Sequence, residues 1–228
     1  MLYGQNPKWI DRLERVLPGL GLPNLALYLI GAQALGFMLT LLDRRVWSLL
    51  VLDPFLVLKG EVWRLVTFLA LPLSADWLWM FLVLYFLYFI VNGIEEEWGE
   101  FRTTLYGLVA MLLTIVFSFV FQRQIVSIAH LESTLFLAAA TIAPEYQILL
   151  FFVVPVKLKW LAWLTVAYIV WALIFGTWLS RLYLLAMYAN YLLFFGPYFW
   201  ERFRAYYRRQ KFKQDVKAGQ IDRERPDE

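Results

Sequence analysis

Six apolar stretches, almost free of charged residues, recur along this 228-residue chain. They cover residues Leu25–Leu42, Trp77–Ile94, Thr103–Phe121, Leu131–Ala143, Leu158–Gly176 and Tyr183–Trp200. A helix of about 20 residues spans the hydrocarbon core of a bilayer. Charged residues make up 17% of the chain, below the roughly 25% usual for soluble domains, and they gather between the stretches. The sequence therefore predicts an all-α, polytopic membrane protein with six transmembrane helices.

The fourth stretch is shorter than the others. A helix over residues 131–143 reaches about 20 Å, less than the ~30 Å of hydrocarbon in a bilayer. Either this helix ends at Pro144 and is shielded inside a bundle, or Pro144 kinks a longer span that continues through Tyr146–Val156. The longer span would place Glu145 near mid-membrane, which is unfavourable without a partner. We therefore expect a short helix followed by a re-entrant or surface-lying stretch.

The charges around the stretches predict the orientation of the chain. Asp43, Arg44 and Arg45 follow the first stretch, so we expect a retained span and not a cleaved signal peptide. With the N-terminus inside, twelve Lys and Arg residues up to Lys213 fall inside and six fall outside. The positive-inside rule then predicts both termini in the cytoplasm, here of a bacterial inner membrane. The expected organisation is a cytoplasmic N-terminal segment (1–24), a membrane domain (25–200) and a charged cytoplasmic tail (201–228).

The segment Trp200–Phe212 mixes Arg and Lys with aromatic residues. One interpretation is a stop-transfer anchor with aromatic belt residues. A second interpretation is an interfacial helix that binds anionic lipid headgroups. Because the segment follows the last span directly, membrane lipids are the expected partner and nucleic acid is not.

The residue types needed for metal and cofactor chemistry are scarce. The chain has no cysteine and one histidine, His130, so disulfides and thiolate metal sites are excluded and no metal site is expected. A glycine-rich phosphate loop and a His-Glu-x-x-His motif are also absent from the sequence. We expect no cofactor.

Two motifs flank the second apolar stretch. The first is Gly60-Glu-Val-Trp63-Arg64, in which Trp63 suits the headgroup level and Arg64 can pair with backbone carbonyls or phosphates. The second has Glu95 and Gly99 in a Glu-x-x-x-Gly turn, where the glycine permits a tight exit and Arg102 can pair with a carboxylate. In this order the two motifs resemble those of the rhomboid superfamily of intramembrane serine proteases. The run Leu84–Phe89 resembles derlins, a branch of that superfamily without proteolytic activity.

The resemblance implies where a catalytic serine and histidine would lie in this chain. In rhomboid proteases the serine lies in Gly-x-Ser-Gly at the start of the fourth helix, and a histidine on the sixth helix activates it. Here no glycine occurs between Gly107 and Gly176, and Ser133 is expected to serve as a helix N-cap. Asn190, or alternatively Met187, stands where that histidine would be, and neither is a general base. His130 and Ser133 remain as weak candidates for a catalytic pair.

The resemblance thus implies a rhomboid-like pseudoprotease that binds transmembrane segments of client proteins, or lipids, without cleaving them. One alternative is an intramembrane serine endopeptidase of the rhomboid class with an atypical site. Another is a structural subunit of a membrane complex. As a remnant of the missing pair, Asn190 is expected to hydrogen-bond to a neighbouring helix, with the fourth helix preferred, through Ser133, Thr134 or a backbone carbonyl.

Overall fold

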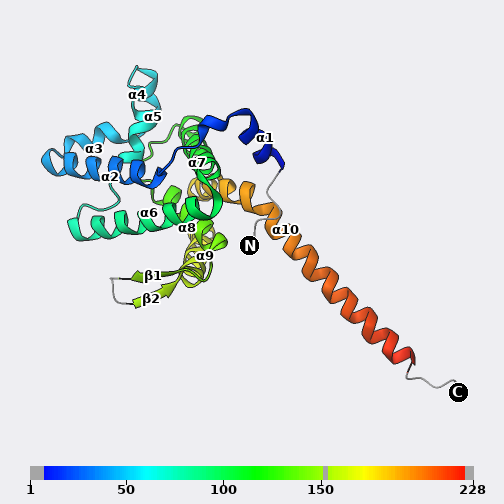
Figure 1. Cartoon of the computed structure of the whole chain (residues 1–228). Coiled ribbons are helices and arrows are strands. Elements are labelled where there is room, and N and C mark those ends of the chain that lie inside the picture. Colours follow the sequence, from blue (N-terminus) through cyan, green and yellow to red (C-terminus); the bar gives the residue numbers. More distant parts are fainter. Residues whose placement is uncertain (1–7, 151–153, 224–228) are drawn as a thin grey trace.

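The computed structural model describes residues 8–150 and 154–223 and shows a helical bundle from which one helix projects (Figure 1). The main helices are α2 (Leu25–Leu42), α6 (Trp77–Trp98), α7 (Glu100–Phe121), α8 (Ala129–Ile142), α9 (Leu158–Phe175) and α10 (Trp178–Arg223). Among the described residues, all of these except α8 are long and apolar enough to cross a membrane. The chain is therefore an integral membrane protein of predominantly helical fold.

Short elements fill the connections between the main helices. The N-terminal helix α1 (Lys8–Val16) and the turn η1 (Pro18–Leu20) precede α2. The connection from α2 to α6 holds α3 (Arg45–Leu50), α4 (Pro54–Leu58), α5 (Arg64–Thr67) and η2 (Phe68–Ala70). The side chains of Asp53 and Asp76 accept backbone N–H bonds at the starts of α4 and α6. Such N-caps explain why these two helices begin where they do.

Helix α8 lies inside the bundle and contacts α6, α7, α9 and α10. Leu131, Thr134, Leu135, Leu137 and Ala138 are all buried. This shielding explains how a helix too short to cross the hydrocarbon core is accommodated. The helix ends at Ile142, so the longer version of the fourth span through Tyr146–Val156 is wrong.

The stretch after α8 is an antiparallel hairpin of β1 (Gln147–Leu150) and β2 (Val154–Lys157). At its base the exposed Glu145 carboxylate pairs with Lys157 at 2.6 Å and Lys159 at 2.5 Å. These hydrogen-bonded cations hold the pKa of Glu145 at about 2, well below its ordinary value. The carboxylate that the longer span would have placed in the membrane is therefore exposed and paired with two lysines.

Contacts at the two ends of α2 fix the direction of its neighbours. At its start, the Glu95 carboxylate accepts the backbone N–H groups of Asn24 and Leu25 at 2.6 and 3.1 Å. Beyond its other end, Leu52 pairs with Ile125 in a β-bridge after α7. Since α2 is about 27 Å long, the end of α6 and the end of α7 lie at opposite faces of the bundle. We call the face with Glu95 the first face and the face with Ile125 the second face.

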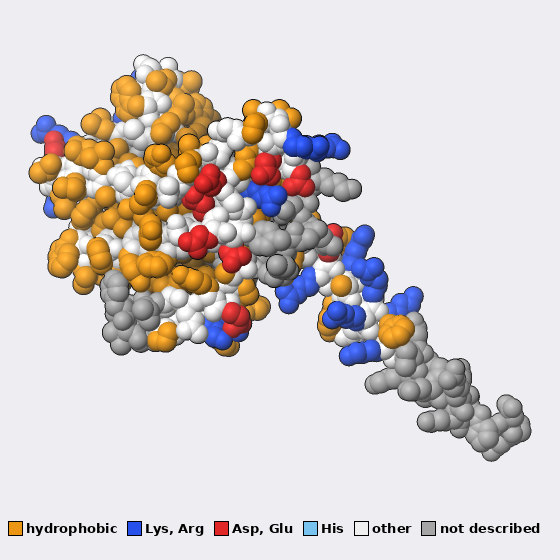
Figure 2. Space-filling view, viewed as in Figure 1, with side chains coloured by type: hydrophobic (Ala, Val, Ile, Leu, Met, Phe, Trp, Pro, Cys, Tyr) orange, Lys and Arg blue, Asp and Glu red, His pale blue; other side chains and the backbone are white. Residues whose placement is uncertain are grey.

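An aromatic cluster closes the bundle at the first face. Trp98 stacks on Phe195 with ring centroids 5.2 Å apart and meets Phe194 edge-on at 5.6 Å. Trp9 of α1 also meets Phe194 edge-on, with ring centroids 5.3 Å apart. The cluster ties α1, α6 and α10 together at the level where α10 leaves the bundle. Figure 2 shows apolar side chains over the bundle, with charged groups gathered near α1 and on the projecting part of α10.

Most of the observed helix boundaries agree with the predicted ones. Helix α2 has the predicted bounds, and α6, α7 and α9 lie within four residues of theirs. The predicted sixth span and the first part of the charged tail belong to one continuous helix, because α10 runs from Trp178 to Arg223.

Candidate functional site

Arg64 is held inside the protein by backbone oxygens. It is 3% exposed, and its Nη1 donates to the carbonyls of Ser48 and Val51 at 2.7 and 2.8 Å. Its Nε donates to Glu61 at 2.8 Å. Trp63 beside it is half-exposed. The expected pairing of Arg64 with backbone carbonyls is confirmed, and its effect is to fold the segment between α2 and α6 onto itself.

The turn between α6 and α7 has the geometry that its glycine allows. Gly99 adopts a φ of +87°, a backbone conformation that side chains disfavour, and the next helix starts at Glu100. Glu95 caps the start of α2, a role that the sequence did not suggest. Arg102 reaches Asp11 and Glu14 of α1 at 3.3 and 3.5 Å. The motif therefore joins α1, α2, α6 and α7 at the first face.

Ser133 lies in the second turn of α8, so its predicted role as N-cap is wrong. The helix begins four residues earlier, where the Ser127 hydroxyl accepts the Ala129 N–H at 3.3 Å. The Ser133 hydroxyl donates to the His130 carbonyl at 2.7 Å and shares a 2.7 Å hydrogen bond with the Tyr188 hydroxyl of α10. Its polar partner is thus a phenol, which is no general base near neutral pH because its ordinary pKa is about 10.

His130 lies one turn before Ser133 on α8, but its ring does not face the serine hydroxyl. The imidazole packs edge-on against the Tyr183 ring, with centroids 5.2 Å apart. It lines a cleft of about 470 Å³ at the second face together with Arg123, Ser127 and Ser180. The two weak catalytic candidates are neighbours in the chain, yet the structure gives their side chains different partners.

Asn190 is fully buried in the bundle and hydrogen-bonds to a neighbouring helix as expected, but this helix is α7 and not the preferred α8. Its Nδ2 donates to the Tyr106 carbonyl of α7 at 3.2 Å. The Tyr106 hydroxyl in turn donates to the Thr134 carbonyl of α8 at 2.9 Å. The direct contact with α8 was therefore predicted wrongly, and Tyr106 is the bridge between the two helices. Met187, the alternative at this place, lies 3.2 Å from the Thr114 hydroxyl through its Sδ.

Two further side-chain pairs hold α8. The Gln33 amide of α2 donates to the Glu132 carboxylate, and the Thr141 hydroxyl shares a 2.6 Å hydrogen bond with the Tyr191 hydroxyl. Sequence reasoning missed both pairs, although a carboxylate inside an apolar stretch signals a polar contact within a bundle. We call the hydrogen-bonded groups around α8 the polar seam: Gln33, Tyr106, Glu132, Ser133, Thr134, Thr141, Tyr188, Asn190 and Tyr191.

The polar seam is suited to holding helices together, not to acyl transfer. Serine hydrolysis needs a base at the serine oxygen and N–H donors for the developing oxyanion. Ser133 bonds to a phenol, and from the second turn of a helix onward backbone N–H groups are used within the helix. Among the described residues no group of three or more His, Cys, Asp or Glu side chains could hold a metal ion.

No family model, no curated protein and no solved structure matches the chain.

Proposed function

We propose that this chain is a non-catalytic, rhomboid-like membrane protein that binds transmembrane segments of other proteins without cleaving them. The observation that carries the proposal is the state of Ser133, whose hydroxyl is paired with Tyr188 while the His130 ring packs on Tyr183. A serine protease brings these two side chains together. Here each has become part of the packing of α8.

The motif residues favour the rhomboid-like part of the proposal. Arg64 organises the segment after α2, and Glu95 with Gly99 organises the first face. Each motif has a structural task that does not depend on catalysis. A chain that lost proteolysis but kept its fold would retain these residues and could lose the serine–histidine pair.

The arrangement of α9 supports binding of another helix. Helix α9 contacts α8 and α10 and is the least buried of the five long apolar helices among the described residues. Near its start, the lining of a cleft of about 60 Å³ between α6 and α8 includes the small residues Gly93, Ala139 and Ala143 beside larger ones such as Phe89 and Glu97. Small residues allow close approach of helices in a membrane, where packing and not the hydrophobic effect drives association. A client helix would lie along this side of the bundle.

An active-site probe tests the absence of catalysis. A fluorophosphonate should leave the detergent-purified protein unlabelled, because Ser133 has no base to make it nucleophilic. The matched variants are Ser133→Ala and His130→Ala. Labelling of the wild-type protein that disappears in both variants would instead establish the alternative, an atypical rhomboid-class protease.

A further inference from the structure

The part of α10 that leaves the bundle is a basic and aromatic helix, which we call the stalk and define as residues Tyr198–Lys213 (Figure 1). Six of its residues are Lys or Arg, and one, Glu201, is acidic. Figure 2 shows Lys and Arg side chains along the stalk. Arg202, Arg204, Arg208 and the other basic residues of the stalk are exposed.

Three aromatic residues of the stalk share one side of the helix, whereas Tyr206 and Phe212 lie on other sides. Successive residues of an α-helix are turned by about 100°, which places Trp200, Phe203 and Tyr207 on one side. The rings of Trp200 and Phe203 are 6.3 Å apart, and those of Phe203 and Tyr207 are 6.0 Å apart. We call these three residues the aromatic stripe. By the same rotation, the basic residues form two rows: Arg204, Arg208 and Lys211 lie beside the stripe, and Arg202, Arg209 and Lys213 lie on the opposite side of the helix.

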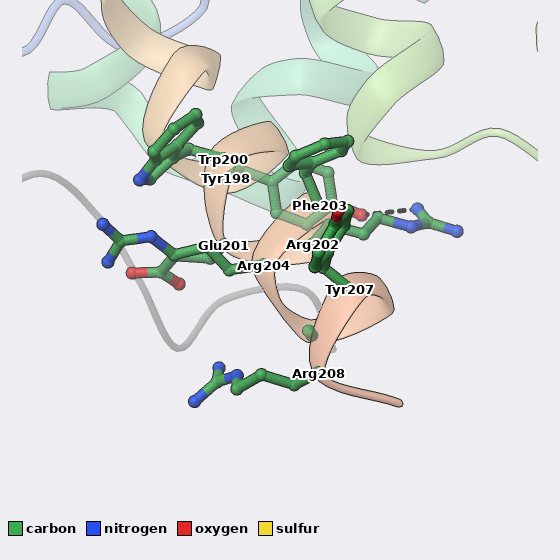
Figure 3. Close-up of a pocket in the computed structure, with 9 residues that line it drawn as sticks. Tyr198, Trp200, Glu201, Arg202, Phe203, Arg204, Tyr207 and Arg208 are labelled. Carbon is green, nitrogen blue, oxygen red and sulfur yellow. Dashed lines mark hydrogen bonds between the residues drawn. The ribbon is translucent and has the colours of Figure 1, made fainter. Parts of the chain in front are cut away.

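Two basic groups of the stalk contact aromatic side chains. The Arg204 guanidinium lies 5.1 Å from the centre of the Trp200 ring, and Arg202 Nη1 donates to the Tyr198 hydroxyl at 2.9 Å (Figure 3). The ion pairs found within the described residues involve Arg64, Arg102, Lys157 and Lys159. Over that part of the chain, the stalk therefore offers cationic groups without an acidic partner.

We propose that the stalk binds the anionic phospholipid headgroups of the bilayer that holds the bundle. A stripe of large aromatic residues flanked by Arg and Lys is the pattern of a helix that lies in a membrane interface. Trp and Tyr favour the headgroup level, and the arginine fork fits phosphate oxygens. The aromatic stripe would face the interface, the row beside it would contact lipid phosphates, and the row on the opposite side would add to the attraction to the anionic surface.

The position of the stalk brings it within reach of those headgroups. It follows directly on Phe194 and Phe195, which are buried in the aromatic cluster at the first face. Pro197 lies in α10 immediately before the stalk and has no N–H to donate, so the helix lacks one backbone hydrogen bond there. This is the point at which the stalk can tilt toward the membrane. The inference uses residues outside the polar seam and does not depend on the proposed client binding.

A dye on the stalk tests this binding in the intact chain. The chain has no cysteine, so Gln210→Cys gives one labelling site. Gln210 follows Phe203 and Tyr207 at i+7 and i+3 and thus continues the aromatic stripe. The labelled protein is placed in two kinds of nanodisc, one of phosphatidylcholine alone and one in which about one lipid in three is phosphatidylglycerol. The second kind has the strongly anionic surface that attracts basic segments. We expect a blue-shifted emission in the anionic discs that reverts in about 1 M salt, where the screening length falls to about 3 Å.

Charge-removal variants make the test specific. The triple change Arg202→Gln, Arg204→Gln and Arg208→Gln should abolish the blue shift. Each basic residue near an anionic surface strengthens association about fivefold, so the ratio of docked to free stalk should fall on the order of 100-fold. The matched control removes three exposed charges from the second face, with Arg44→Gln, Arg45→Gln and Lys59→Gln, and should keep the shift.

Equal emission in the two kinds of disc would overturn the proposal. That comparison uses the unmutated basic rows, so it holds even if the triple variant fails to fold. Inorganic phosphate and a polyuridine oligonucleotide are added separately to phosphatidylcholine discs. A shift produced by either of these, but not by phosphatidylglycerol, would assign the stalk to free phosphate or to RNA and would also overturn the proposal.

Discussion

Replacement of Gly36 by alanine should produce a direct steric clash between α2 and η2. A Cβ atom at this position of α2 would lie 1.9 Å from the Ala70 carbonyl oxygen of η2, whereas ordinary contact begins near 3.4 Å. Gly36→Ala therefore requires α2 and η2 to separate by about 1.5 Å, the difference between these distances. Overpacking of this kind costs about 1–3 kcal/mol, and the higher helix propensity of alanine offsets about 0.5–1 kcal/mol. We expect a net destabilisation of about 1–2 kcal/mol.

The matched control is Gly31→Ala on the same helix, where a Cβ atom would meet nothing within 4 Å. Thermal unfolding in detergent, followed by tryptophan fluorescence, compares the two variants. Since 1 kcal/mol corresponds to about 2–4 °C for a chain of this size, Gly36→Ala should lower the Tm by about 2–8 °C. Gly31→Ala should leave it unchanged or slightly raised. Equal Tm values for the two variants would refute the close packing of α2 on η2.

Three further outcomes follow from the described contacts. Ser133→Ala and Tyr188→Phe should each cost on the order of 0.6 kcal/mol of unfolding free energy, and the double variant should cost no more than either; additive losses in this cycle would show that the two hydroxyls do not interact. Because Lys157 and Lys159 lower the pKa of Glu145 to about 2, their pairing stabilises the hairpin base above about pH 4.5, and this contribution is lost as the pH falls toward 2. The Tm difference between wild type and Glu145→Gln should therefore shrink as the pH falls from roughly 5, just above the ordinary pKa of a glutamate, to roughly 2, its lowered pKa. A Tm difference that stays constant over this range would argue against these ion pairs. Single cysteines at Val62 and Glu97, which are exposed at opposite faces, should react with a membrane-impermeant thiol reagent from opposite sides; labelling from one side would contradict the arrangement around α2.

The sequence predicted the apolar helices well, because a bilayer demands uninterrupted apolar residues. The prediction of helix ends failed where a helix continues beyond the end of its apolar region. Arg and Lys are good helix formers, so the charges after Trp200 mark the exit from the apolar region while α10 continues. Helix α8 begins at Ala129 and not at Ser133, and its N-cap residue Ile128 makes no side-chain cap hydrogen bond. Because no hydroxyl or carboxylate side chain stands at the N-cap position of this helix, a search for a capping residue could not locate its start.

Two elements were missed although the chain carries signals for them. Trp9, Ile10 and Leu13 in α1 have helical spacing, and Ile10 and Trp9 pack into the bundle. The apolar residues around the hairpin include several valines and isoleucines, which favour strands. The partners of the polar seam could not be predicted, because Ser133 and Tyr188 are 55 residues apart and meet only through the packing of α8 on α10.

Photo-crosslinking in membranes tests the central claim that the chain holds transmembrane segments without cutting them. A photoreactive amino acid replaces Trp163, an exposed residue of α9, and the masses of the crosslinked partners are measured. We expect adducts with full-length membrane proteins, in equal yield from the wild-type chain and from the Ser133→Ala chain. Shortened partners in the wild-type chain that become full-length in Ser133→Ala would contradict the account.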